Sequence, residues 1–90
     1  MSRRHPLLLP ELGLGPAPVC TSLWLVRTGS EVSAGDRVLE VTAGVVCIDL
    51  PAPISGVLVE QLVAEDEIVH TGQPLAWLEE SAETAEGDTA

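Results

Sequence analysis

The stretch EVTAGVVCIDLPAPISG, Glu40–Gly56, carries the strongest structural signal in this chain of 90 residues. After Gly44, apolar residues alternate with Cys47 and Asp49, a period of two that is typical of a strand with one buried face. Gly44 accepts a positive φ and therefore allows a tight turn between two strands. The stretch predicts a β-hairpin over Glu40–Leu50 that ends at the prolines following it.

The rest of the chain repeats this pattern of short apolar runs separated by turn residues. Glycine, proline and aspartate between the runs are too frequent for helices, and the runs have the usual length of strands. Further runs lie at residues 21–26, 37–41, 56–63 and 74–79. The apolar residues are mainly leucine, valine and alanine, with neither phenylalanine nor tyrosine. We expect an all-β fold with one modest aliphatic core.

An internal repeat becomes visible when the sequence is shifted by 37 residues. Val32 then falls on Val69 and Gly35 falls on Gly72, with other apolar pairs in the same phase. Two similar strand–turn–strand units are therefore expected, each of which needs the other to bury its apolar face. The repeat predicts a quasi-twofold sandwich or flattened barrel, with the hairpin projecting from one end.

The charge of the chain bounds the kinds of partner it can have. The formal charge is −10, from 14 carboxylates against four arginines. A nucleic-acid partner is not expected, because phosphate binding needs clustered basic residues, and electrostatic steering would favour a basic protein surface. The apolar run Leu7–Leu9 is followed by Pro10 and Glu11 and is too short for a membrane span or a signal sequence. We expect a cytoplasmic protein.

The ordered domain is expected to comprise residues 6–79. Residues 1–5 are predicted to be a disordered N-terminus. Residues 80–90 are predicted to be a disordered acidic tail, because their small and charged side chains bury too little apolar surface to become ordered.

The side chains offer little chemistry for catalysis. The chain has no lysine, which excludes Schiff bases and amide-linked biotin or lipoate on its side chains. Cys20 and Cys47 lack metal-site spacing, so we predict no metal and no cofactor, and expect two largely buried thiols in a reducing compartment. Asp36, Glu40 and Asp49 are expected on a solvated acidic face. We predict no enzymatic activity.

Five motifs follow one another without insertion or deletion. They are PELGLG at 10–15, WLVRTG at 24–29, VSAGDRVLEV at 32–41, PAPISG at 51–56 and VHTGQPLA at 69–76. In this order and spacing the chain resembles the biotinyl/lipoyl domain family, and most closely the lipoyl domains of dihydrolipoyl acyltransferases of 2-oxo acid dehydrogenase complexes. The resemblance implies a flattened β-barrel (a barrel-sandwich hybrid) of two four-stranded sheets, with a modified lysine on an exposed hairpin turn.

The position of that lysine falls on Val45 in this sequence. Turns of the family read T-D-K-A or A-M-K-M, whereas this turn reads Ala43-Gly44-Val45-Val46. The resemblance therefore implies a degenerate carrier that cannot be lipoylated or biotinylated. Its expected role is protein–protein docking to a component of a 2-oxo acid dehydrogenase or related multienzyme complex. The expected partner-facing site is the hairpin tip, Ala43, Gly44, Val45 and Val46.

Several alternatives stay open at the level of the sequence. One alternative is a thiol-based or small-molecule carrier with Cys47 as the attachment point, and another is a relic without function. The loop Pro16–Pro18 either leaves the hairpin tip free or folds over it. Trp24 and Trp77 are either anchors for a partner or, as we expect, packing residues at the edge of the core.

Overall fold

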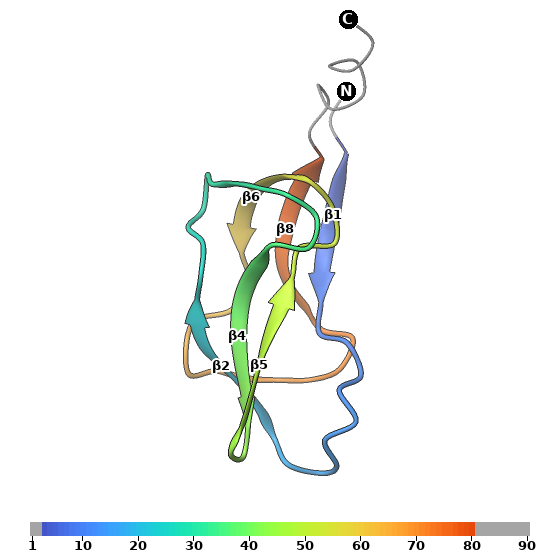
Figure 1. The fold of residues 1–90 in the computed structure, drawn as a ribbon, viewed down its shortest axis with the longest axis vertical. Helices are drawn as coiled ribbons and strands as arrows, with labels where there is room; N and C mark the ends of the chain where they lie inside the picture. Colours follow the sequence, from blue (N-terminus) through green and yellow to red (C-terminus); the bar gives the residue numbers. More distant parts are fainter. Residues whose placement is uncertain (1–2, 81–90) are drawn as a thin grey trace, which may run out of the picture.

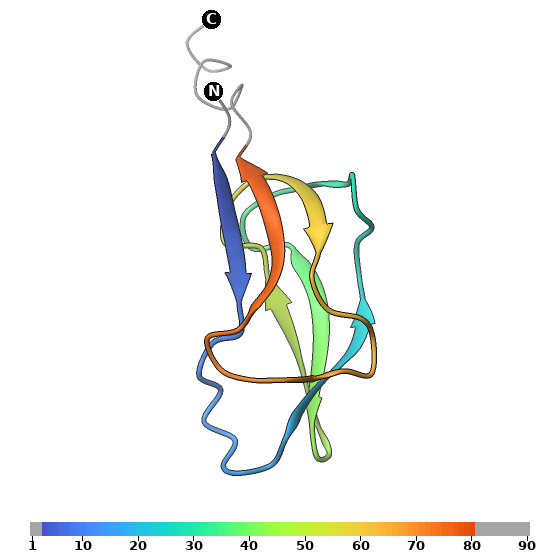
Figure 2. The same ribbon diagram turned by 180° about the vertical axis from the view of Figure 1, so that it is seen from behind.

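The computed structural model describes residues 3–80, which form eight β-strands and no helix. The strands are β1 (Arg4–Leu8), β2 (Val19–Trp24), β3 (Glu31–Val32), β4 (Arg37–Ala43), β5 (Val46–Pro51), β6 (Gly56–Gln61), β7 (Ile68–Val69) and β8 (Pro74–Glu80). Antiparallel pairing joins them into two four-stranded sheets, in the orders β1-β8-β6-β3 and β5-β4-β2-β7. The sheets face each other across the core, as Figures 1 and 2 show from opposite sides. The predicted flattened barrel of two four-stranded sheets is confirmed.

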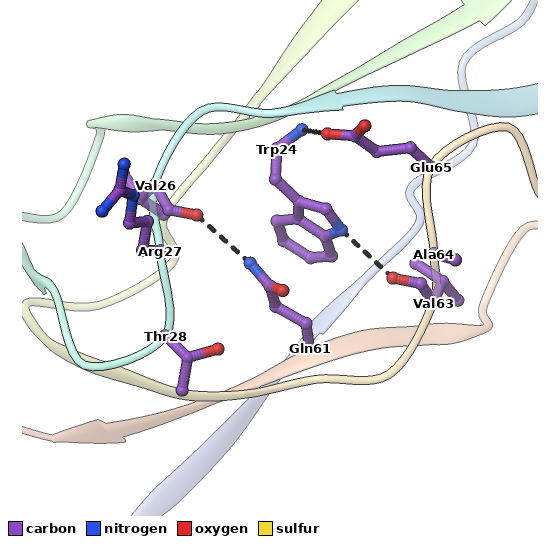
Figure 3. Close-up of a pocket in the computed structure, with 8 residues that line it drawn as sticks. All are labelled: Trp24, Val26, Arg27, Thr28, Gln61, Val63, Ala64 and Glu65. Carbon is purple, nitrogen blue, oxygen red and sulfur yellow. Dashed lines mark hydrogen bonds between the residues drawn. The ribbon is translucent and has the colours of Figure 1, made fainter.

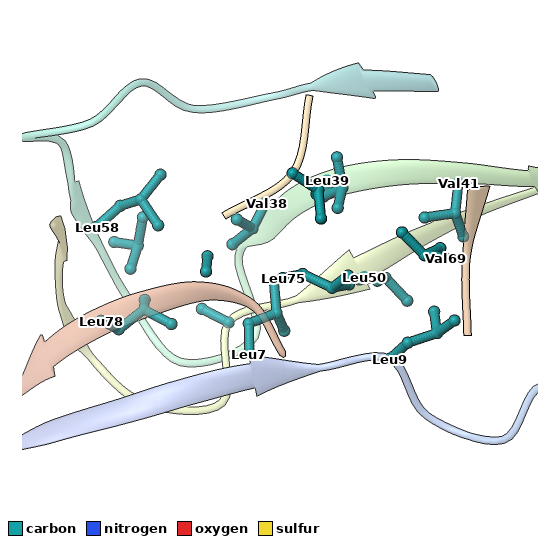
Figure 4. Packing of buried hydrophobic residues seen from close by; sticks show 14 residues of the cluster. Leu7, Leu9, Val38, Leu39, Val41, Leu50, Leu58, Val69, Leu75 and Leu78 are labelled. Atoms are coloured by element: carbon teal, nitrogen blue, oxygen red, sulfur yellow. The ribbon is translucent and has the colours of Figure 1, made fainter. Parts of the chain in front are cut away.

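The core is aliphatic and lies between the inner faces of the two sheets (Figure 4). Leu39 and Val41 of β4, and Leu75 and Leu78 of β8, are each at most 1% exposed. Trp24 is only partly buried and packs against this cluster, which confirms its expected place at the edge of the core. Branched aliphatic side chains suit strands, so the two sheets enclose this core without a covering helix.

The predicted internal repeat is present in the strands. β2, β3 and β4 recur 37 residues later as β6, β7 and β8, with the same lengths. The β2–β4 and β6–β8 pairings also carry a β-bulge at equivalent positions. The turns before β4 and β8 hold Gly35 and Gly72 at φ of +94° and +87°, where other residues would be strained. The two units therefore share both their strands and their turns.

The ends of the domain depend on the pairing of β1 with β8. β1 begins at Arg4, two residues before the predicted boundary at residue 6, because Arg4 is in register with Glu79 of β8. β8 includes Glu80, and the rest of the predicted acidic tail lies outside the described residues. The described part of the chain contains no helix that could cross a membrane. The expected cytoplasmic location stays a prediction.

Gly56 is the position where the fold tolerates a side chain least. A Cβ atom there would collide with the backbone carbonyl of Glu79 on the neighbouring β8. Backbone atoms cannot move aside without breaking the β6–β8 ladder, so we expect Gly56→Ala to lower the free energy of unfolding by about 3 kcal/mol or more. Urea unfolding measures this loss.

Gly29→Ala is the matched control. Gly29 has open space around it, and its φ of +95° alone would strain an alanine, by about 1–2 kcal/mol. Equal losses in the two variants would contradict the close approach of β8 to Gly56.

Candidate functional site

β4 and β5 form the hairpin predicted from the sequence, and its tip is the candidate site. Ala43 pairs with Val46, so Gly44 and Val45 are the two residues of the loop. Gly44 has a φ of +63° whereas Val45 keeps a negative φ, a pattern typical of the type II′ turn that matches the twist of paired strands. Val45 is 99% exposed and Val46 is 39% exposed. Val45 is therefore at the apex of the turn.

Side chains on the inner face of β5 become more exposed toward the turn. Leu50 is 2% exposed, Ile48 is half-buried, and Val46 is 39% exposed. The hairpin projects beyond the barrel at one end, while the start of β1 and the end of β8 lie at the other end (Figures 1 and 2). The hairpin tip thus points away from both ends of the described chain.

The hairpin tip and the loop before β2 are both free of charged residues. Neither Leu12–Val19 nor Val41–Ile48 contains a charged residue, although the formal charge of the chain is −10. The loop before β2 lies beside the hairpin, since Val19 is in register with the last residue of β4. The alternative that Pro16–Pro18 covers the tip is wrong, because Val45 is almost fully exposed.

An amide-linked cofactor does not fit this turn. Ligation of biotin or lipoate needs a side-chain amine, and the side chain of Val45 contains only carbon and hydrogen. Its neighbours Gly44 and Val46 offer no amine either, and the chain contains no lysine. The residues at the hairpin tip can present apolar surface but cannot hold the cofactor that the family fold implies.

The two cysteines lie on the outer face of the sheet that contains the hairpin. Cys47 is exposed and Cys20 is half-buried, so the expectation of two largely buried thiols is wrong for Cys47, which lies on the edge strand β5. Both are in register with Thr42, one on each side of β4. Two strand spacings separate them by about 10 Å, which is too far for a disulfide. Within residues 3–80, no three metal-ligating side chains lie together.

A hollow of about 470 Å³ on the flank of the barrel belongs to the scaffold (Figure 3). Its lining consists of four pairs related by the 37-residue repeat, namely Trp24 and Gln61, Val26 and Val63, Arg27 and Ala64, and Thr28 and Glu65. Trp24 Nε1 donates to the carbonyl oxygen of Val63 at 3.1 Å, and Gln61 Nε2 donates to that of Val26 at 3.2 Å. These reciprocal hydrogen bonds join the two repeat units across the hollow.

Comparison with known proteins identifies the family. The chain matches the family described as "Biotin-requiring enzyme" over residues 5–78. It is 37% identical over 89 residues to the dihydrolipoyllysine-residue acetyltransferase component of the acetoin cleaving system of Pseudomonas putida, covering 98% of this chain and 24% of that protein. It is 35% identical over 71 residues to the corresponding component of the pyruvate dehydrogenase complex of Mycobacterium bovis, covering 79% and 13%. The chain spans about a quarter or less of the length of these relatives.

Among solved structures, the fold resembles part of a single-chain, multi-domain long-chain acyl-CoA carboxylase, with a TM-score of 0.71 and 21% identity, covering 93% of this chain and 8% of that one. The barrel and its projecting hairpin define a carrier-type domain, not a catalytic one. The chain belongs to the biotin/lipoyl family, and its relatives are lipoyl-type acyltransferase components. The resemblance inferred from the five motifs is confirmed.

Val45→Lys tests whether the turn still presents a side chain as a carrier does. Expressed with lipoate, biotin and their ligases, this variant is expected to gain the mass of one adduct, because residue 45 is at the exposed apex of the hairpin. The native protein is expected to gain none. Intact-mass spectrometry makes the measurement.

Val46→Lys is the matched control, one residue along the same hairpin. Its side chain starts from the strand and is only 39% exposed, so it is expected to stay unmodified. An unmodified Val45→Lys would contradict the expectation that the turn presents residue 45 as a carrier does.

Proposed function

We propose that this chain is a degenerate lipoyl-type domain that carries no cofactor and docks to a component of a 2-oxo acid dehydrogenase or related multienzyme complex. Its relatives are named as components of the acetoin cleaving system and of the pyruvate dehydrogenase complex, which supports a partner of this kind. Of the predicted tip, Gly44, Val45 and Val46 make the contact, because Ala43 is only 5% exposed. The observation that carries the proposal is the almost complete exposure of Val45.

Burial of the hairpin tip in an apolar pocket is favourable for a simple reason. A valine side chain that leaves water contributes about 1.5 kcal/mol, which is about a tenfold gain in affinity. The loop Leu12–Val19 beside the tip contributes no charged group that a partner would have to desolvate. The tip alone is smaller than a stable interface, so the docking is transient or uses further surface.

The thiol alternative has exposure in its favour but no activating group. Cys47 is exposed on the same hairpin. The arginine of this hairpin, Arg37, pairs with Asp49 at 3.5 Å and is therefore already engaged by a carboxylate. Docking through the hairpin tip uses the side chain of Val45, which is almost fully exposed, and we prefer this proposal to the thiol alternative.

Binding of the purified protein to purified components of such complexes, measured at low salt, tests the proposal. The native protein is expected to bind. Val45→Asp is expected to bind at least about tenfold more weakly, because an unpaired carboxylate is costly to place in an apolar pocket.

Ala34→Asp is the matched control. It adds the same charge in the exposed turn before β4, at the end of that strand away from the hairpin tip, and is expected to bind like the native protein. Equal losses in both variants would show an effect of net charge and not of the tip. No binding by the native protein at low salt would count against docking.

A further inference from the structure

The outer face of the sheet β5-β4-β2-β7 carries two carboxylates in direct opposition. Glu40 on β4 and Asp49 on β5 are partners in the antiparallel register. Side chains in such positions are about 5 Å apart, and like charges there oppose the pairing of the strands. The two carboxylates therefore weaken the hairpin that they belong to.

Of these two carboxylates, only Asp49 has an ion-pair partner among the described residues. Arg37 Nη1 lies 3.5 Å from Asp49 Oδ2, but the arginine side chain is 76% exposed, so the ion pair contributes little. Glu40 Oε1 accepts a hydrogen bond from Ser22 Oγ at 3.4 Å. No cation among the described residues forms an ion pair with Glu40. One negative charge on this face is unmatched within residues 3–80.

The repeat provides an internal comparison. The residue equivalent to Glu40 in the second unit is Trp77, which is opposite Pro6 in the pairing of β1 with β8. The equivalent place on the other sheet thus holds a neutral, apolar pair. Arg4 and Glu79, also opposite each other on that sheet, have complementary charges. The same backbone arrangement accepts neutral or complementary pairs, so the barrel does not require two carboxylates here.

Exposed apolar side chains flank the carboxylates. Leu23 of β2, which is in register with Glu40 of β4, is 47% exposed. Ile68 on β7 is 55% exposed and in register with Cys20, one row nearer the hairpin tip. All eight described strands belong to the two sheets, so none of them covers this surface. The result is an amphipathic face that continues toward the hairpin tip.

We infer that this acidic face, defined by Glu40, Asp49, Leu23 and Ile68, docks a protein surface that presents a lysine or arginine beside an apolar side chain. Charge complementarity selects this occupant, since a cation beside Glu40 and Asp49 removes a repulsion that the free domain retains, on a chain of formal charge −10. A divalent cation fits less well, because two carboxylates fill few of its ligand positions. The inference rests on the proposed docking function and extends its footprint beyond the hairpin tip.

The experiment compares Glu40→Gln with Glu60→Gln. Glu60 is exposed on β6 and opposite Trp77, so each variant removes one negative charge from an outer face, but from different sheets. The probe is the purified dehydrogenase component that the native protein binds. At low ionic strength, Glu40→Gln is expected to bind about fivefold to tenfold more weakly and with a smaller salt dependence, and Glu60→Gln to stay within about twofold.

A second measurement needs no partner. In urea, Glu40→Gln is expected to unfold at a higher midpoint than Glu60→Gln, because its repulsion with Asp49 is gone. An equal or lower midpoint would remove the premise that the free domain retains this repulsion, and the inference with it.

The binding outcomes separate this inference from the proposed function. Native-like binding by Glu40→Gln, or equal losses in the two glutamine variants, would overturn the acidic face. If Val45→Asp still weakens binding in that case, docking through the hairpin tip stands without it. Loss of native binding in EDTA would assign the carboxylates to a cation and overturn the inference. Failure of the native protein to bind any component would remove the proposed function and this extension of it together.

Discussion

Neither unit of the 37-residue repeat can bury its own apolar face. The structure therefore depends on the packing of the two units against each other, which buries both apolar faces. Val38 and Leu75 occupy equivalent places in the two units, and both are fully buried in the one core they share. The flanking hydrogen bonds follow the same rule, since Trp24 of the first unit donates to the second and Gln61 of the second donates to the first. The two units are therefore joined by the core that they share and by these two hydrogen bonds.

The apex of the hairpin is free of packing contacts because it projects beyond the core that the two units share. Along β5, burial falls from Leu50 to an apex at Val45 that packs against nothing in the barrel. The turn itself closes through Gly44, whose positive φ sets the backbone whatever the next side chain is. The fold consequently places no demand on residue 45. A lysine or a valine there leaves the core and the turn unchanged, so the family fold is compatible with a valine at this position.

Much of the fold could be predicted from the sequence because alternation, turn residues and the repeat agree. β1, β3 and β7 were not among the predicted runs; Arg4 of β1 is polar, and its place in the sheet comes from pairing with Glu79 at the far end of the described chain. Alternation along residues 46–50 already places Cys47 on the same face as Asp49, but its exposure also depends on the position of β5 at the edge of its sheet. Such facts depend on partners distant in sequence.

For the candidate site, the register of the five motifs was enough to place the apex at Val45, but its exposure depended on the path of a separate loop. The pairing of Glu40 with Asp49 could have been found earlier. A two-residue turn at Gly44 and Val45 determines the register of the whole hairpin, and counting outward from it sets these two carboxylates opposite each other. The expectation of one solvated acidic face leaves out this cross-strand pairing, although the turn determines it.

The two sheets have equivalent strand arrangements but differ in their loops and in the side chains on their outer faces. β5 follows β4 through a tight turn, whereas its counterpart β1 is far from β8 in the sequence, so only one sheet has a projecting hairpin. That sheet also carries the like-charged pair, while the other has Pro6 and Trp77 at the equivalent place. Local conflicts with the folding rules are expected at functional sites, because elsewhere they only reduce stability. An exposed valine and an unmatched carboxylate on the same sheet, with a neutral copy of the arrangement on the other, favour a binding surface over chance.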